Sequence, residues 1–232
     1  MVERPIFVAK PSSRELVEEV FLHLIWRPGF AATEKKENIR ALHEAAENAG
    51  YRNVLEVSTK SANKRGRHLS AFHLRVKTTQ GSVPLECAFQ GSKVFERGGP
   101  FVDLLNAVPR DAKKDRRLKE SGDLIAFRFE GIDWPLEPKT ALYDWLYITS
   151  IYPHRDWAVK LYAYGGFSDI EFDPTRSISC QARSVALFLS LMKRGQLDQA
   201  MKSSSDFINI LRDSDYRPRL RVEEAPPTLL SA

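Results

Sequence analysis

The segment LSAFHLRVKTTQGSVPLECAFQGSKVFE, residues 69–96, contains the clearest change of pattern in the chain. Alternating apolar and polar residues over 69–79 predict a strand, and Gly81-Ser82 predicts the turn that follows it. A helix is predicted to begin at about Glu86. It is predicted to end at Glu96, because the RGGP sequence at 97–100 stops a helix firmly. The segment therefore predicts a strand, a turn and a helix in direct succession.

The predicted helix in this segment carries a line of polar side chains. Residues three and four apart share a helix face, so Glu86, Gln90 and Lys93 form one stripe. A carboxylate, an amide and an ammonium in one line are either a solvated surface or the lining of a pocket for a charged sugar-phosphate. The stripe alone leaves both interpretations open.

The rest of the chain is predicted to be rich in helices, with a few short strands. Apolar spacing places Leu16, Val20 and Leu24 on one face of a helix over 12–24, and Thr33 is the expected N-cap of a helix over 34–49. A hairpin is predicted around Glu130-Gly131. The other expected elements are a strand at 53–59, a helix with a basic turn at 101–119, and helices at 139–152, 156–164, 176–194, 196–202 and 204–212.

These elements predict a helix-rich α+β fold with a small antiparallel sheet. Residues 1–212 are expected to form one domain, because no repeat, linker or low-complexity tract divides them. From Asp213 onward the sequence DSDYRPRLRVEEAPPTLLSA has no hydrophobic period and many prolines and charges. Residues 213–232 are therefore predicted to be a flexible tail.

Composition limits the functional classes. The chain of 232 residues has two cysteines and five histidines, with no metal-ligand spacing and no glycine-rich phosphate loop. Neither a metal nor a cofactor is therefore expected. No apolar run is as long as a membrane span and the N-terminus lacks a secretory pattern, so no membrane association is expected. Two cysteines make no disulfide framework, which favours the cytoplasm.

The formal charge of +5 is concentrated partly in two basic runs. These are KSANKRGRH at 60–68 and AKKDRRLK at 112–119, on either side of the segment quoted above. They are either solvated loops or a rim that contacts nucleic-acid phosphates. The candidate DNA-contacting residues are Lys64, Arg65, Arg67, Lys113 and Lys114.

Four side chains are candidates for chemistry, two of them from the polar stripe, and each has a plain structural alternative. Glu86 is a candidate acid or base, or simply favours the positive end of a helix. Lys93 is a solvated lysine, or a desolvated one that can act as a nucleophile. Trp134 is a core residue, or a flat surface on which a base stacks. Asp169, in the acidic segment FSDIEFDPTRS, projects into a cleft if that segment borders one.

Several of these motifs together resemble one protein family. The run LSAFHLRV…VPLECAFQGSKVFE is similar to the NADAR signature, an L-S-N-F element followed by a strand and an E-H-A-[FY]-x-x-x-K helix. FEGIDWPLEPKTALYDWLYI and FSDIEFDPTRSISCQARSVALFL resemble the branch of antitoxins encoded beside DarT-type DNA ADP-ribosyltransferase toxins. The resemblance covers roughly residues 5–212.

The resemblance implies an N-glycosidase that removes ADP-ribose from guanine in single-stranded or flipped DNA, with ADP-ribose as a product and a DarT-type toxin as a possible partner. Glu86 and Lys93 match the family glutamate and lysine, and Trp134 and Asp169 are weaker matches. Catalysis is thus assigned to Glu86, Lys93 and Asp169. The substrate-binding candidates are Ser70, Phe72, Gln90, Gly98, Gly99 and Trp134.

Two positions depart from the family pattern, with Ala71 in place of asparagine and Cys87 in place of histidine. If those side chains touch the ligand elsewhere in the family, the contacts or the substrate differ here. Two alternatives therefore stay open. One is an antitoxin that binds ADP-ribose or DNA without catalysis, and the other is an N-glycosidase of a small ribosyl-amine metabolite.

Overall fold

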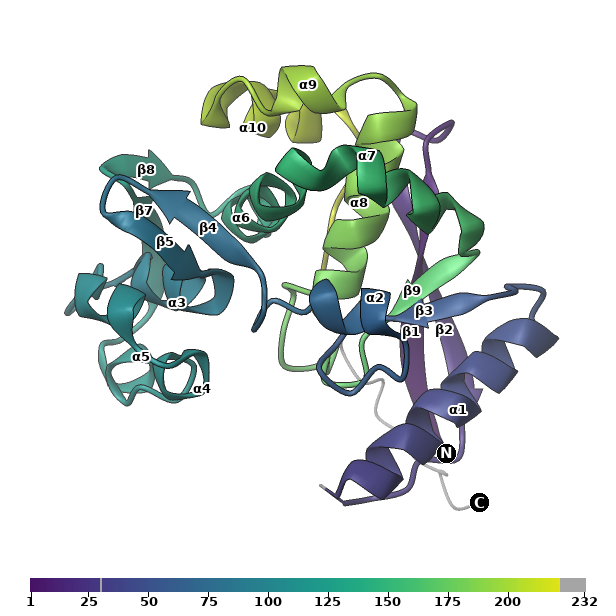
Figure 1. Cartoon of the computed structure of the whole chain (residues 1–232). Helices are drawn as coiled ribbons and strands as arrows, with labels where there is room; N and C mark the ends of the chain where they lie inside the picture. The colour runs from purple at the N-terminus through teal and green to yellow at the C-terminus, as the bar shows by residue number, and fades with distance from the viewer. Residues whose placement is uncertain (30, 222–232) are drawn as a thin grey trace, which may run out of the picture.

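The computed structural model describes residues 1–29 and 31–221, which fold into one domain around a mixed four-stranded sheet (Figure 1). The strand order is β2 (Leu16–Leu24), β1 (Val2–Lys10), β9 (Gly166–Ser168) and β3 (Val54–Glu56). β1 pairs antiparallel with both neighbours, whereas β3 and β9 are parallel. The α+β class is confirmed, although this sheet is mixed and two smaller antiparallel sheets accompany it.

Side-chain alternation along β1 gives the large sheet a different helix on each face. Consecutive strand residues point to opposite faces. Ile6 accordingly packs with Leu42 and Ala46 of α1 (Ala32–Asn48). Phe7 joins the main core, which includes the apolar side of α8 (Gln181–Lys193). The sheet is therefore enclosed between α1 and α8 (Figure 1).

The two smaller sheets lie in the middle of the chain. β4 (Arg75–Thr78) and β5 (Gly81–Pro84) form a hairpin, and α3 (Leu85–Gly91) begins directly after it. β6 (Lys93–Phe95), β7 (Leu124–Phe129) and β8 (Ile132–Trp134) form the third sheet. α6 (Ala141–Ile151) packs against both α3 and α8 and so joins this half of the molecule to the large sheet.

The remaining elements are short. They are α2 (Lys64–His68), a 3-10 helix at Val102–Asn106, α4 (Pro109–Ala112), α5 (Arg117–Glu120), 3-10 helices at Tyr152–His154 and Val159–Ala163 on either side of α7 (Arg155–Ala158), α9 (Leu197–Ala200) and α10 (Ser204–Asp213). Within the described residues, no helix combines the length and the apolar character needed to cross a membrane.

The helix predicted over 12–24 is wrong, because Leu16–Leu24 is strand β2 and pairs with β1 along its whole length. A spacing of four residues places side chains on one face of a helix, but it also places them on one face of a strand. Val20, Leu22 and Leu24 all pack in the α1 cluster, as strand alternation requires. The apolar pattern fits the period of a helix and the period of a strand equally. Pairing of nine residues with β1 selects the strand.

Other boundaries also differ from the sequence-based expectation. The strand predicted over 69–79 is reduced to Arg75–Thr78, and the helix predicted over 86–96 ends at Gly91. The helix predicted over 101–119 is split into three short helices. α1 is confirmed, but its N-cap is Ala31 and no side chain caps it. The strand at 53–59, the hairpin, and the helices at 139–152, 196–202 and 204–212 are confirmed with shifted ends.

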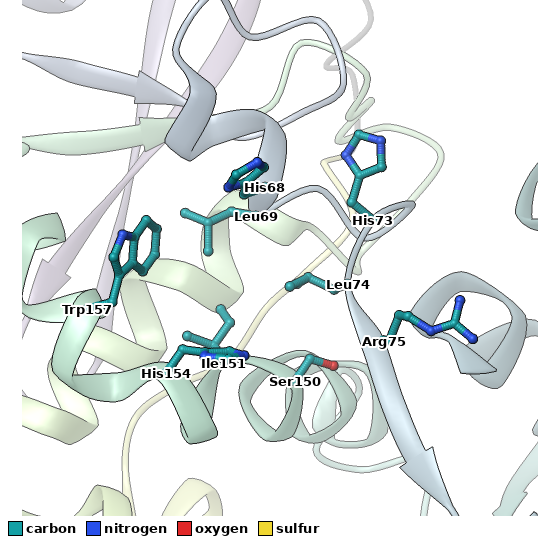
Figure 2. Close-up of a pocket in the computed structure, with 9 residues that line it drawn as sticks. All are labelled: His68, Leu69, His73, Leu74, Arg75, Ser150, Ile151, His154 and Trp157. Carbon is teal, nitrogen blue, oxygen red and sulfur yellow. The ribbon is translucent and has the colours of Figure 1, made fainter. Parts of the chain in front are cut away.

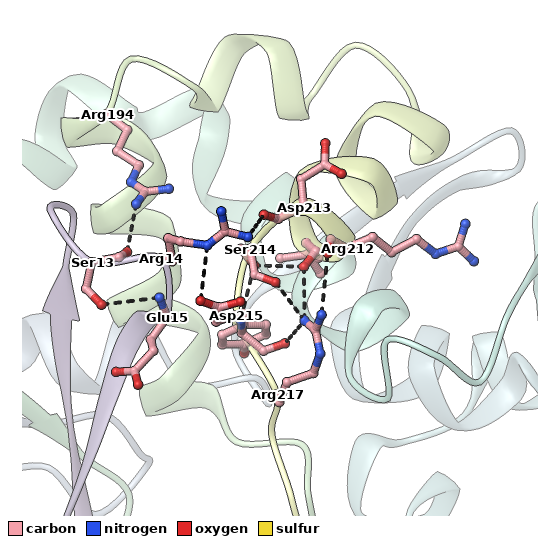
Figure 3. Close-up of polar contacts among 11 residues, drawn as sticks. Ser13, Arg14, Glu15, Arg194, Arg212, Asp213, Ser214, Asp215 and Arg217 are labelled. Atoms are coloured by element: carbon pink, nitrogen blue, oxygen red, sulfur yellow. Dashed lines mark hydrogen bonds and ion pairs between the residues drawn. The ribbon is translucent and has the colours of Figure 1, made fainter.

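The first part of the predicted tail is packed against the domain (Figure 3). Arg14 donates from Nε to Asp215 Oδ2 at 3.1 Å and from Nη2 to the carbonyl of Asp213 at 3.0 Å. Tyr216 is buried, and its hydroxyl donates to Asp144 Oδ2 at 2.9 Å. Ordered packing thus continues past α10, and the remainder of the predicted tail, 222–232, lies outside the described residues.

Candidate active site

One cavity of about 660 Å³ is lined by half of the candidate residues, including all three catalytic candidates. It lies where α3, α6, the end of β9 and the start of α8 meet, and we call it the active-site cavity. Its volume falls within the range of small-molecule sites. The lining residues include Arg4, Trp26, Lys35, Ser70, Ala71, Phe72, Glu86, Phe89, Gln90, Lys93, Lys113, Lys119, Tyr143, Asp169, Glu171, Asp173, Arg176 and Gln181.

The predicted polar stripe is a hydrogen-bonded chain on one wall of this cavity. Gln90 Nε2 donates to Glu86 Oε1 at 2.9 Å, and Lys93 Nζ donates to Gln90 Oε1 at 2.7 Å. Glu86 and Gln90 belong to α3 and are buried, whereas Lys93 follows the helix as the first residue of β6. The Gln90 amide therefore links the carboxylate to the ammonium and fixes the position of both.

Lys93 is held in an environment that weakens its charge. Burial lowers the pKa of the lysine to about 8, the Glu86 carboxylate opposes this, and nearby Lys113 adds to it. The ammonium lies 4.9 Å from the centre of the Phe89 ring. A lysine with a pKa of about 8 has a useful neutral fraction near neutral pH, so it can serve as a nucleophile or a base.

Asp169, just after β9, lines the same cavity, and the pKa of its carboxyl is shifted upward rather than downward. Burial raises the pKa of its carboxyl to about 8, with the Glu56 carboxylate as the second cause. The backbone N–H of Glu171 donates to Oδ1 at 3.0 Å, and Gln181 adds a side-chain hydrogen bond. A carboxyl with this pKa is largely protonated at neutral pH, so Asp169 can donate a proton.

A buried network behind Asp169 fixes its backbone. Glu56 accepts hydrogen bonds from Ser168 Oγ at 2.5 Å and from the Ile170 N–H at 2.9 Å, one on each side of Asp169. His43 Nε2 lies 2.9 Å from the same Ser168 hydroxyl. Burial raises the pKa of Glu56 and lowers the pKa of His43 to about 4. The Glu56 carboxyl therefore determines both the position of Asp169 and part of its pKa.

A third part of the cavity contains an indole ring beside cationic side chains, and the sequence analysis missed it. The Arg4 guanidinium lies 4.7 Å from the centre of the Trp26 ring, and Lys35 Nζ lies 5.9 Å from it. Arg4 Nε is buried and has no hydrogen-bond partner among the described residues. The tryptophan of HLIWRPG is visible in the sequence, but no sequence pattern places it beside Glu86 or Asp169.

The structure separates the predicted site residues into two groups. Glu86, Lys93, Asp169, Ser70, Phe72, Gln90 and Lys113 line the active-site cavity, whereas Gly98, Gly99, Trp134, Lys64, Arg65, Arg67 and Lys114 are not among its lining residues. Both arginines of α2 contact the protein itself. Arg65 Nη1 donates to the Tyr164 hydroxyl at 3.1 Å, and Arg67 Nη1 donates to the Ser61 carbonyl at 2.7 Å.

Trp134 and Gly99 have structural environments that differ from the predicted binding role. Trp134 is 2% exposed and packs on Trp145 with ring centres 5.6 Å apart, so neither face of its ring is open to a base. Gly99 has φ of +92°, and a Cβ there would lie 2.2 Å from the Lys93 carbonyl oxygen. This glycine allows the chain to pass close to Lys93, which is a backbone requirement.

The two departures from the family motif lie in different places. Ala71 lines the cavity, and its N–H donates to Gln181 Oε1 at 2.8 Å. Cys87 is fully buried against Leu104 and Ala112, and its Sγ donates to the Ala107 carbonyl at 3.1 Å. Ala71 therefore shapes the ligand space directly, while Cys87 belongs to a separate small core.

The fold and the cavity define an α+β protein with a basic ligand site that a lysine–glutamate chain and a partly buried aspartic acid both line. The family model of the DarT1-associated NADAR antitoxins matches residues 2–220, and the chain belongs to this family. The resemblance inferred from the sequence is thereby confirmed. No curated protein matches the chain significantly. A DarT1-associated antitoxin has a DarT toxin as its expected partner.

Proposed function

We propose that the protein is an N-glycosidase that removes ADP-ribose from guanine bases in single-stranded DNA and so reverses the modification made by a DarT toxin. The observation that carries this proposal is the Glu86–Gln90–Lys93 hydrogen-bond chain in the same cavity as Asp169. Membership of the antitoxin family supports it. The ADP-ribosyl substrate and the chemistry are inferences from these two facts.

The side chains supply what cleavage of a ribose–nitrogen bond requires. Breaking the bond from the ribose anomeric carbon to the guanine nitrogen develops oxocarbenium-like positive charge on the sugar, which a carboxylate stabilises. In this proposal Glu86 supplies that carboxylate and takes a proton from the attacking water. Asp169, largely protonated at neutral pH, gives its proton to the departing guanine nitrogen. Water is thus split between the sugar and the base.

Lys93 has two possible tasks at the ribose, and its geometry supports both. Its hydrogen bond to Gln90 places the ammonium next to Glu86, where it contacts the ribose hydroxyls or the diphosphate. Its neutral amine can instead attack the anomeric carbon and displace the guanine, whose nitrogen takes the Asp169 proton. The ribose ring then opens to give a Schiff base with Lys93, which water hydrolyses. Trapping with borohydride separates the two, because only a Schiff base is reduced to a stable covalent adduct.

The remainder of the cavity suits an adenosine diphosphate group. The partly exposed Trp26 ring offers a surface for adenine, and Arg4 and Lys35 lie beside it. Lys113, Lys119 and Arg176 add positive charge to the lining. Cations near an aromatic surface are the arrangement that binds a nucleotide diphosphate.

The test is release of unmodified DNA from a single-stranded oligonucleotide that carries ADP-ribose on one guanine. Glu86→Gln keeps an acceptor for Gln90 but removes the charge, and Lys93→Ala removes the amine. Each is expected to lower kcat by about 10²–10⁴-fold. Lys77→Ala is the matched control, because Lys77 is exposed on β4 and does not line the cavity.

The alternatives give distinct outcomes in the same experiment. If the wild-type protein binds ADP-ribose but releases no DNA, the protein is a binding antitoxin and the proposed hydrolase is wrong. If Glu86→Gln and Lys93→Ala both release DNA at the wild-type rate, the activity stands and the site assignment is wrong.

A further inference from the structure

A second cavity, of about 550 Å³, lies outside the active-site cavity (Figure 2). It is formed by the end of α2, the loop leading into β4, the end of α6 and the turns that follow α6. His68, His154 and Trp157 contribute aromatic rings to it, and Leu74 and Ile151 contribute aliphatic side chains. Figure 2 shows the three rings around one side, with the aliphatic side chains projecting between them and Arg75.

The two cavities share a wall. In the loop before β4, Ser70, Ala71 and Phe72 line the active-site cavity, while His68 and His73 on either side of them line the second cavity. Along α6, Tyr143 lines the first and Ser150 lines the second. At 1.5 Å per residue the distance between these two positions along the helix is about 10 Å. A single DNA strand with one base in the active-site cavity would therefore bring a neighbouring nucleotide close to the second cavity.

The lining chemistry selects a planar, uncharged group. No aspartate or glutamate is among the described residues that line the second cavity, and its one fixed charge is that of Arg75. Indole and imidazole rings offer π faces on which any base can stack. Trp157 is partly buried against the main core, so one side of the indole is held in place while the other contributes to the cavity.

The alternative of a metal ion has no support. Three histidines line the cavity, but no group of histidine, cysteine or carboxylate side chains within the described residues is arranged to hold a metal. His73 Nδ1 also lies 2.8 Å from the Arg67 carbonyl, which engages one nitrogen of its ring. The surroundings instead favour a base that belongs to a polyanion, because α2 places Lys64, Arg65 and Arg67 directly before His68.

We infer that this second cavity binds a base of the DNA strand adjacent to the modified guanosine, stacked on Trp157 and flanked by His68 and His154. The inference rests on the proposed function, because the active-site cavity defines where the modified nucleotide lies. It also gives the basic residues of α2 a role, since their charges accompany the phosphates that follow this base. The predicted DNA contacts of Lys64, Arg65 and Arg67 are thereby assigned to the second cavity, while Lys113 stays in the lining of the active-site cavity.

The test compares two substrates that differ only in whether they reach the second cavity. One is ADP-ribosylated guanosine as the free nucleoside, and the other is a single-stranded oligonucleotide of about ten nucleotides with the same modification. Trp157→Leu and His154→Ala are expected to raise KM for the oligonucleotide by about 5- to 100-fold, the loss associated with one stacked base. For the nucleoside, kcat and KM are expected to stay within twofold of the wild-type values.

Val159→Ala is the matched control, because Val159 is exposed two positions after Trp157 and does not line the cavity. Equal losses with both substrates in Trp157→Leu and His154→Ala would overturn the inference, because the cavity would then only support the fold. Unchanged kinetics with both substrates would overturn it as well.

A separate measurement keeps this inference distinct from the proposed function. Fluorescence anisotropy with an unmodified single-stranded oligonucleotide reports binding without any hydrolysis. A protein that releases no ADP-ribose, yet binds the oligonucleotide more weakly after Trp157→Leu, would lack the proposed activity and retain the base-binding cavity. Equal binding by the wild type, Trp157→Leu and His154→Ala would overturn the base-binding cavity even in an active hydrolase.

Discussion

The α3 wall and the β9 wall of the active-site cavity are built in different ways. On the α3 wall, Glu86, Gln90 and Lys93 are close in sequence and touch one another through two hydrogen bonds. On the β9 wall, Asp169 depends on Glu56, more than a hundred positions earlier in the chain. The first wall is a local arrangement, and the second exists only because β3 and β9 pair. The candidate catalytic groups thus come from one short segment and from one network that tertiary packing assembles.

Asp169→Asn is expected to have the largest effect, because it removes the proposed proton donor of the β9 wall and leaves the α3 wall intact. We expect kcat to fall by about 10²–10⁴-fold at neutral pH. In the wild type, the protonated acid is lost as pH rises through about 8, so activity should decline across that range. The variant should lack this decline. A pH–rate profile with an unchanged alkaline limb in Asp169→Asn would contradict the role of Asp169.

Two tryptophans sharpen the comparison, because one lines the cavity and the other lies in the core. Trp26→Ala is expected to raise KM by about 5- to 100-fold, as the loss of one stacked base would. Trp134→Phe is expected to lower the free energy of unfolding by about 1–3 kcal/mol while KM stays unchanged. Steady-state kinetics and urea unfolding measure both. A raised KM in Trp134→Phe alone would restore the sequence-based assignment of that residue.

Glu56→Gln tests whether the buried network controls the acid. The amide can still accept from the Ile170 N–H, and its NH₂ can donate to Ser168 Oγ, whose hydroxyl can then donate to the neutral His43 ring. The geometry is retained and the charge is removed. Because the Glu56 charge raises the pKa of Asp169, the alkaline limb of the pH–rate profile should move to lower pH. A limb that stays near pH 8 would show that burial alone sets the pKa.

Cys87→Ala is expected to have the smallest effect on activity. Cys87 occupies the small core formed with Leu104 and Ala112, and its thiol donates only to the Ala107 carbonyl. We expect kcat and KM to remain within about twofold, with a loss of about 1 kcal/mol in the free energy of unfolding. Ala71→Asn is the informative partner, since Ala71 lines the cavity. If Cys87→Ala is fully folded under the assay conditions and still loses activity, the assignment of Cys87 to a core outside the cavity is contradicted.

The sequence was informative about the elements whose signals are local. The hairpin at Glu130-Gly131 was predicted from its turn residues, and Gly131 indeed has φ of +74°. The helices α6, α9 and α10 were also predicted, and in the structure Ser203 caps α10 through its side chain. The stripe of Glu86, Gln90 and Lys93 was predicted from helical spacing, although Lys93 lies just beyond the helix.

The sequence failed where a pattern fits two structures or where burial decides. The spacing of Leu16, Val20 and Leu24 fits both a helix and a strand, and pairing with β1 selected the strand. The sequence alone does not distinguish Trp134 from Trp26 as a stacking surface. In the folded protein, Trp134 packs on Trp145 and is removed from solvent. The burial of a tryptophan depends on neighbours distant in the chain, which periodicity does not report.

By itself, the sequence determined the helix-rich α+β class, the polar stripe of α3 and the motifs that place the chain in its family, because each of these depends on residues a few positions apart. Only the tertiary structure decided that Asp169 lines the same cavity as this stripe, that Glu56 holds the residues on either side of Asp169, and that Trp26 completes the cavity. The pKa of about 8 at both Lys93 and Asp169 likewise comes mainly from burial, which exists only after distant segments pack together.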